Sequence, residues 1–283
     1  MTAPLVLHVR LQEFQAVVRS HHSRVLERLA AAYPAAELRP ADCPCAAAPS
    51  LDLTVGAVEH LGDVSKVVGH LEAAINGAAI AALQHRVLLH AGVVATADGA
   101  VVLPGRSGLG KSTLVAALCQ AGFAYFSDDI AVLGGPPPRV FPFMKAVSLK
   151  RGGVRALGDR GGAVGAFEAI RPDGSVVRHL TPPRLAGSNG RPVRYVLLLD
   201  RRPQDAATLR PVPRARALAE LAAHSMNLPR HGRHGLEILS QVVEGADCYE
   251  LTYSRLPEAV EALAGVTGHR PFVGDAPTLC EPR

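Results

Sequence analysis

A glycine-rich loop between a buried strand and an apolar helix constrains this chain more than any other feature. Residues 105–113 spell Gly-Arg-Ser-Gly-Leu-Gly-Lys-Ser-Thr, which matches the pattern G-x-x-x-x-G-K-[ST] in full. The apolar run at 101–103 predicts the strand that enters the loop, and residues 111–121 predict the helix that leaves it. Glycines let successive backbone N–H groups point at phosphate oxygens beside a helix N-terminus, so the arrangement predicts a phosphate-binding loop.

Every residue of this loop is a candidate nucleotide contact. The set comprises Gly105, Arg106, Ser107, Gly108, Leu109, Gly110, Lys111, Ser112 and Thr113. In such a loop Lys111 would bridge the β- and γ-phosphates, and the Ser112 hydroxyl would coordinate Mg²⁺. Lysine is scarce here, with only four lysines among 30 basic residues, so an ammonium at this position is informative. The predicted ligands are therefore ATP and Mg²⁺.

Two adjacent carboxylates follow the next predicted strand, at residues 123–127. Asp128 and Asp129 would lie at the carboxyl edge of the sheet beside the loop, where ligands bind in open α/β sheets. Neighbouring residues on a strand face opposite sides, so both reach the site only if the chain turns there. One carboxylate could then hold Mg²⁺ while the other accepts a proton from a hydroxyl. A simple turn or helix cap is the structural alternative.

His90 precedes the loop, in the apolar run Leu-Leu-His-Ala-Gly at 88–92. A single histidine in an apolar strand is commonly a hydrogen-bonded core residue, and that alternative stays open. Near the loop it would be a candidate catalytic residue.

Together, these motifs resemble the HPr serine kinase/phosphorylase family and its relatives, whose core is similar to that of phosphoenolpyruvate carboxykinase. The resemblance covers about 88–133. It implies an α/β fold with a P-loop kinase core of that type, with Asp128 as the general base, Asp129 as a Mg²⁺ ligand and His90 assisting or restraining the base. The family's glutamate-rich signature is not found, and Glu168 is the only acidic residue in that region.

Downstream residues extend the resemblance. Residues 142–150, Pro-Phe-Met-Lys-Ala-Val-Ser-Leu-Lys, are similar to a segment of HPr-kinase-like proteins encoded beside peptide-modification genes. Lys145 and Lys150 could return to the site and offset charge on the transferred phosphoryl group, or could be a solvated pair. An arginine-rich stretch at 184–216 could receive an acidic or carboxylate substrate or supply a catalytic arginine, with Arg201 and Arg202 best placed. Codon bias is the competing explanation of these arginines.

Patterning along the chain predicts a small N-terminal α/β domain at 1–86, a P-loop kinase domain at 87–265 and a loose tail at 266–283. In the first domain, strands are expected at 5–11 and 51–55, with helices at 12–32 and 64–86. In the second, Asp98-Gly99 predicts a tight hairpin between strands at 87–96 and 100–104. Further strands are expected at 193–200 and 248–253, and helices at 214–224, 232–244 and 256–264. The segment His-Ser-Met-Asn at 224–227 is interpreted as a helix cap.

Composition narrows the functional classes. Hydrophobic residues make up 48% and charged residues 19%, which is typical of a globular chain. A net charge of +5 without finger spacings or interleaved basic and aromatic residues does not indicate nucleic-acid binding. No long uncharged apolar run is present, so neither membrane insertion nor a signal peptide is predicted, and a cytoplasmic location is expected.

The sequence thus predicts an ATP- and Mg²⁺-dependent kinase that phosphorylates a hydroxyl, with a serine of a peptide or small protein as the first choice of acceptor. A non-catalytic module that senses ATP, or a small-molecule kinase acting for instance on free serine, are the alternatives. The family resemblance is also compatible with a homo-oligomer.

Overall fold

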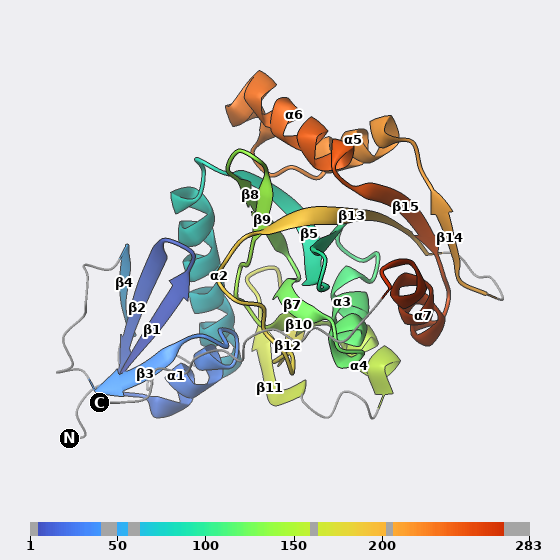
Figure 1. Ribbon diagram of the computed structural model, residues 1–283. Coiled ribbons are helices and arrows are strands. Elements are labelled where there is room, and N and C mark those ends of the chain that lie inside the picture. The colour runs from blue at the N-terminus through green and yellow to red at the C-terminus, as the bar shows by residue number, and fades with distance from the viewer. Residues whose placement is uncertain (1–4, 41–49, 56–62, 159–163, 202–205, 269–283) are drawn as a thin grey trace. The chain divides into compact units, whose positions relative to one another are not determined.

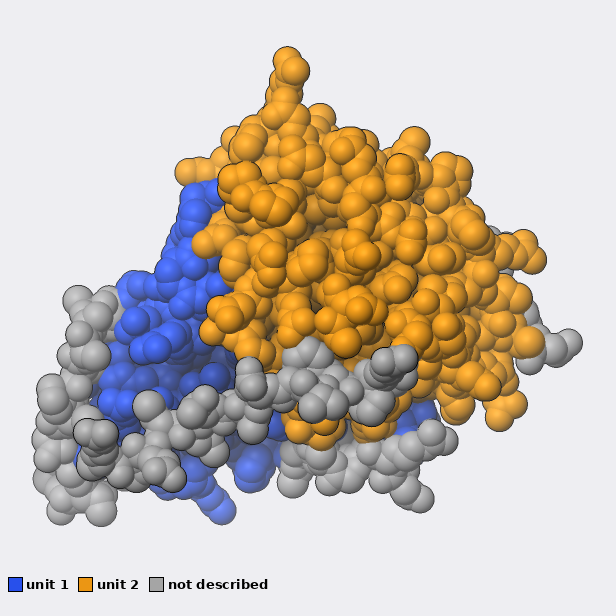
Figure 2. Space-filling view, in the orientation of Figure 1, with its two compact units in different colours: residues 1–85, 144–181 blue, residues 86–143, 182–283 orange. Residues whose placement is uncertain are grey.

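The computed structural model describes residues 5–40, 50–55, 63–158, 164–201 and 206–268. The chain is a mixed α/β protein that divides into two compact units (Figure 2). Unit 1 combines residues 1–85 with 144–181, and unit 2 combines residues 86–143 with 182–283. The segment 144–181 therefore belongs with the N-terminal residues, although the sequence patterning placed it in the kinase domain. The tail predicted beyond residue 268 lies outside the described residues.

Unit 1 contains two small sheets and three helices among its described residues. A four-stranded sheet has the order β3-β1-β2-β4 and a three-stranded sheet the order β10-β12-β11. The elements are β1 (Leu5–Leu11), β2 (Phe14–Ser20), α1 (Ser23–Ala30), β3 (Glu37–Pro40), β4 (Leu51–Val55), α2 (Val64–Ala82), β10 (Val147–Leu149), α4 (Arg151–Leu157), β11 (Val164–Ile170) and β12 (Val176–Leu180).

The helix predicted over residues 12–32 is wrong in its first half. Gln12 adopts a positive φ of 58° and turns the chain, so that β2 pairs antiparallel with β1. β2 also pairs in parallel with β4 and is therefore a central strand. Its buried residues Phe14, Ala16, Val17 and Val18 do not alternate strictly along the strand, and such a pattern is easily mistaken for the period of a helix. Only the second half forms a helix, α1.

Unit 2 is built on an eight-stranded sheet with helices on both faces. Its strands are β5 (Val87–Ala95), β6 (Ala100–Pro104), β7 (Ala124–Ser127), β8 (Ile130–Gly134), β9 (Arg139–Phe141), β13 (Arg191–Asp200), β14 (Thr208–Pro211) and β15 (Asp247–Thr252). Its helices are α3 (Lys111–Gln120), α5 (Arg214–Ala223), α6 (Leu228–Glu244) and α7 (Leu256–Val266).

Strand pairing places the glycine-rich loop at one end of this sheet. The sheet has the order β14-β15-β13-β6-β5-β8-β9, with β7 attached to β5. β5 and β6 form the predicted antiparallel hairpin, whereas β6, β13 and β15 run parallel to one another. The carboxyl ends of these three strands therefore meet at the edge where β6 leads into α3, as Figure 1 shows.

The core of unit 2 explains which side chains face the loop. Leu89, Ala91 and Val93 of β5 pack in one buried cluster with residues of α5 and α6. The intervening Gly92 points to the other face, where a Cβ would lie 2.7 Å from Val115 of α3. Because residues alternate along a strand, His90 faces the same side as Gly92, toward α3.

No helix in the described part of the chain is long and apolar enough to cross a membrane.

Candidate functional site

The glycine-rich loop turns between β6 and α3 through conformations that glycine adopts without strain. Gly108 has a φ of 95°, and Gly110, the N-cap of α3, has a φ of 88°. Such left-handed backbone is costly for residues that carry a Cβ. The glycines found in the sequence pattern thus occupy the positions where the backbone requires them, and the loop ends at the N-terminus of a ten-residue helix.

Lys111 folds back over this loop. Its Nζ donates hydrogen bonds to the carbonyl oxygens of Gly105 at 2.6 Å and Arg106 at 3.0 Å, and the residue is only 5% exposed. Burial lowers the pKa of Lys111, while the carboxylates of Asp129 and Asp128 oppose that shift. An ammonium held among carbonyl oxygens can transfer its hydrogen bonds to phosphate oxygens without moving out of the site.

His90 is brought next to this lysine. Its Nε2 lies 3.3 Å from Lys111 Nζ. Burial lowers the pKa of His90, and the neighbouring Lys111 ammonium lowers it further, so the neutral form is favoured. A neutral Nε2 without its proton accepts a hydrogen bond from the ammonium. Position 90 therefore contributes a polar contact to the loop lysine.

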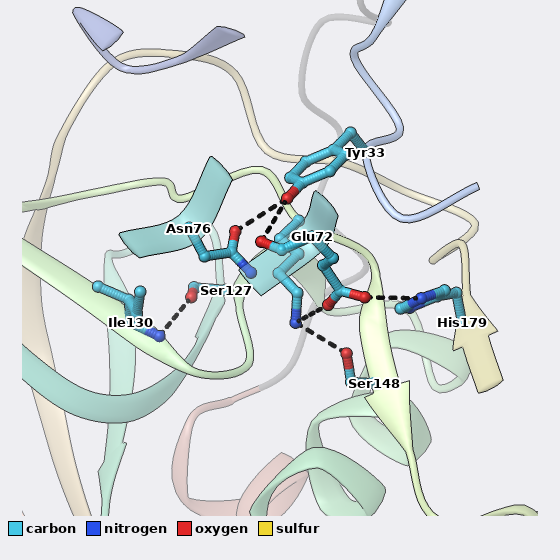
Figure 3. Close-up of polar contacts among 8 residues, drawn as sticks. Tyr33, Glu72, Asn76, Ser127, Ile130, Ser148 and His179 are labelled. Carbon is cyan, nitrogen blue, oxygen red and sulfur yellow. Dashed lines mark hydrogen bonds and ion pairs between the residues drawn. The ribbon is translucent and has the colours of Figure 1, made fainter. Parts of the chain in front are cut away.

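The Asp128-Asp129 pair sits in a turn between β7 and β8. Ser127 Oγ accepts a hydrogen bond from the backbone N–H of Ile130 at 3.1 Å and closes this turn (Figure 3). The chain leaves strand geometry here, which is the condition for both carboxylates to serve one site. Both act electrostatically on Lys111. Their exposure differs, since Asp128 is 1% exposed whereas Asp129 is half-buried.

Ser112 and Asp129 supply the kind of donors that suit Mg²⁺. The ion prefers oxygen ligands and is commonly held by one or two carboxylates together with substrate phosphates. Ser112 follows Lys111 in the first turn of α3 and is half-buried, as is Asp129. The described residues contain no group of three or more His, Cys, Asp or Glu side chains that could hold a metal ion by themselves. A hydroxyl and a carboxylate completed by nucleotide phosphates fit this chemistry.

The downstream lysines belong to unit 1. Lys145 is buried, and its Nζ lies 3.1 Å from Glu72 Oε1 and donates a hydrogen bond to Ser148 Oγ at 2.8 Å (Figure 3). Lys150 is exposed and immediately precedes α4. The catalytic roles expected for both stay predictions, and for Lys145 the structure shows an internal ion pair. Arg202 lies outside the described residues.

The segment 224–227 interacts with β5 in a way that the sequence did not indicate. Asn227 is the N-cap residue of α6, but its side chain makes no capping bond. It accepts a hydrogen bond from Leu88 N–H at 2.9 Å and donates one to the carbonyl of Arg86 at 2.8 Å. The capping interpretation is wrong for this residue, whose polar side chain ties the segment to the sheet instead.

His224, from the same segment, was missed as a site residue. Its carbonyl accepts a hydrogen bond from the backbone N–H of His90 at 2.8 Å. Burial lowers the pKa of His224, and Lys111 and Arg106 lower it further against the effect of Glu220. No local pattern in the sequence signals this proximity, because it arises from a segment that pairs with β5 across a large sequence separation.

Comparisons with known proteins add little to this geometry. No family model matches the chain, and no curated protein matches it. Among solved structures, the chain is similar to the Hpr(Ser) kinase/phosphatase from Coxiella burnetii, at 12% identity over 64% of this chain and 90% of that one. The TM-score is 0.29, and a likeness at that level carries no argument about this protein.

Proposed function

We propose that this protein is an ATP- and Mg²⁺-dependent kinase that transfers the γ-phosphoryl group to a hydroxyl, with a serine of a peptide or small protein as acceptor. One observation carries the proposal: a buried lysine at the start of α3, inside a glycine-rich loop, lies within electrostatic reach of two carboxylates in the β7–β8 turn. This is the set of groups that phosphoryl transfer uses, namely a phosphate cradle, a cation and carboxylates for metal and proton.

In the proposed reaction the loop N–H groups and Lys111 hold the β- and γ-phosphates. Bound Mg²⁺ would neutralise charge on the phosphates, with Ser112 and Asp129 as its protein ligands. Asp128 would accept the proton of the acceptor hydroxyl as its oxygen bonds to the γ-phosphorus and the bond to the ADP oxygen breaks. His90 would orient Lys111 through the 3.3 Å contact. Positioning and charge stabilisation would supply most of the rate.

The test is transfer of label from γ-labelled ATP to candidate acceptors, above all a peptide encoded beside this gene. Labelled peptide supports the proposal, whereas a labelled metabolite such as phosphoserine identifies a small-molecule kinase. Lys111→Ala should reduce turnover by at least a hundredfold, because it removes a charge contact to the transferred group. Wild-type turnover in this variant would remove the phosphate-loop assignment.

Asp128→Asn and Asp129→Asn separate the two carboxylate roles. Asp128→Asn should abolish transfer and leave ATP binding intact. Asp129→Asn should lower the affinity for Mg²⁺, so that a higher Mg²⁺ concentration is needed for activity. The reverse result would exchange the roles, with the half-buried Asp129 as the base.

A second function, an ATP-sensing module without transfer activity, is favoured by one observation. Asp128 is 1% exposed, and a general base must come within hydrogen-bond reach of its substrate. ATP binding without labelled product from any acceptor, in the presence of Mg²⁺, would support this alternative.

A further inference from the structure

Two residues beyond the sequence motif lie at the same edge of the sheet as the loop. Arg201 directly follows β13, and Tyr253 directly follows β15. The two strands run parallel, with Asp200 paired to Thr252, so Arg201 and Tyr253 leave the sheet side by side. β13 also runs parallel to β6, which leads into the loop. The topology thus brings both residues to the end of the sheet where β6 leads toward α3.

Gly110 shows how closely these residues approach the loop. A Cβ placed on this glycine would lie 3.2 Å from the Tyr253 hydroxyl oxygen and 3.9 Å from Arg201 Nη1. Gly110 is the N-cap of α3 and immediately precedes Lys111. The Tyr253 phenol and the Arg201 guanidinium therefore flank the loop at the N-terminus of α3, next to Lys111.

Tyr253 presents one polar group, its hydroxyl, beside the loop. Tyr253 is 2% exposed, and its hydroxyl makes no hydrogen bond with any residue in the described part of the chain. A hydroxyl that has no partner among these residues can donate its hydrogen bond to a ligand held by the loop. Burial raises the pKa of Tyr253 while the nearby Arg201 opposes the rise, so the hydroxyl stays protonated and available as a donor.

Arg201 is also uncommitted. It forms no ion pair or hydrogen bond within the described ranges, and it is exposed. Arg216, by contrast, pairs with Glu250. A guanidinium beside a helix N-terminus, without an ion-pair partner among the described residues, is suited to a phosphate group, which it can engage with two parallel hydrogen bonds.

We propose that Arg201 and Tyr253 form a second wall of the phosphate site and donate hydrogen bonds to the β- and γ-phosphates of the bound nucleoside triphosphate. This inference rests on the proposed function, because it assumes that the loop binds a nucleotide. The β- and γ-phosphates are assigned because Lys111, the next residue after Gly110, is the one that reaches them in loops of this type.

Binding measurements on the full-length protein test this wall. Titration calorimetry with Mg-ATP and with inorganic pyrophosphate compares the wild type with Arg201→Gln and Tyr253→Phe. Arg201→Gln should weaken both ligands about tenfold, the effect of losing a hydrogen bond to a charged group. Tyr253→Phe should weaken both by about threefold, and Arg201→Lys should recover part of the arginine's effect. Thermal unfolding without nucleotide verifies that each variant is folded.

Arg194→Gln is the matched control. Arg194 is an exposed arginine near the opposite end of β13, where it lines a cleft of about 250 Å³ with Asp98 and Asp247. Arg194→Gln removes the same charge as Arg201→Gln, and Arg194 belongs to the strand that Arg201 follows, but it lies far from the loop. This variant should bind both ligands as the wild type does, which shows that any effect at position 201 is local.

The outcomes separate this inference from the proposed function. If the wild type binds Mg-ATP and Arg201→Gln binds it equally well, the second wall is wrong and the kinase proposal stands. If Arg201→Gln binds ATP more weakly but binds pyrophosphate as the wild type does, Arg201 lies against the base or ribose and the inference is overturned. If the affinity for ATP is unchanged and the KM for the acceptor is raised, Arg201 contacts the acceptor and the inference is overturned as well. A wild type that binds neither ligand overturns both proposals.

Discussion

Glu72 of α2 is the centre of a buried charge network in unit 1, and its replacement gives the sharpest stability prediction. Its carboxylate lies 3.1 Å from Lys145 Nζ and 3.2 Å from His179 Nε2 (Figure 3). The side chains of Glu72 and Lys145 are each 3% exposed. Tyr33 adds a hydrogen bond to the Glu72 backbone carbonyl at 3.3 Å and one to Asn76 at 3.1 Å. A buried ammonium and a buried carboxylate thus form an ion pair inside unit 1.

Glu72→Gln keeps the size of the side chain and one acceptor oxygen but removes its charge. At 3.1 Å and an effective dielectric constant of about 20, the attraction is about 5 kcal/mol. Breaking a buried pair from one side leaves the other charge uncompensated and costs roughly 3–5 kcal/mol. The free energy of unfolding should therefore fall by about 3–5 kcal/mol, a large part of the roughly 5–15 kcal/mol of a whole domain.

Urea unfolding at pH 7, followed by circular dichroism, measures the loss. Glu168→Gln is the matched control, because the Glu168–Arg178 pair belongs to the same unit but its side chains are 40% and 43% exposed. It should cost about 0–1 kcal/mol. The double variant Glu72→Gln/Lys145→Met removes both charges and should recover most of the stability. A loss below about 1 kcal/mol for Glu72→Gln alone would refute the argument that the pair is buried and interdependent.

Two further predictions follow from the same structure. Burial alone would raise the pKa of Glu72, but Lys145 and His179 lower it below the ordinary value of 4.5, so its ionised form contributes stability above about pH 4.5 that is lost as the pH falls further. Acid unfolding followed by fluorescence should show this loss in the wild type and a smaller one in Glu72→Gln, and identical acid profiles would contradict it. Gly110→Ala should weaken ATP binding at least tenfold, because the φ of 88° is strained for alanine and the added Cβ would meet the Tyr253 hydroxyl. Gly77→Ala, in α2 with open space around it, should instead bind ATP normally and gain up to about 1 kcal/mol in stability; equal ATP affinity in both variants would show that the loop conformation is not required.

Local patterns allowed much of the site to be predicted from the sequence. The strand, loop and helix around Lys111 are adjacent in the chain. The glycines mark the loop through its backbone conformation, and the apolar run marks the strand through its burial. The β5–β6 hairpin follows from Asp98-Gly99, and the turn at Asp128 lies one helix and one strand beyond the loop. These contacts are short in sequence, so residue type and spacing determine them.

Contacts between distant segments were decided only by the tertiary structure. The strand β2 was predicted as helix because its apolar residues do not alternate strictly, and only its pairing with β1 on one side and β4 on the other defines it as a strand. Residues 144–181 join unit 1 through the buried contacts of Lys145 and His179 with Glu72, and no local signal marks that partnership. Arg201 and Tyr253 meet at Gly110 because three parallel strands end together. The sequence alone determined the glycine-rich loop, and the order of strands in the sheet decided which side chains surround it.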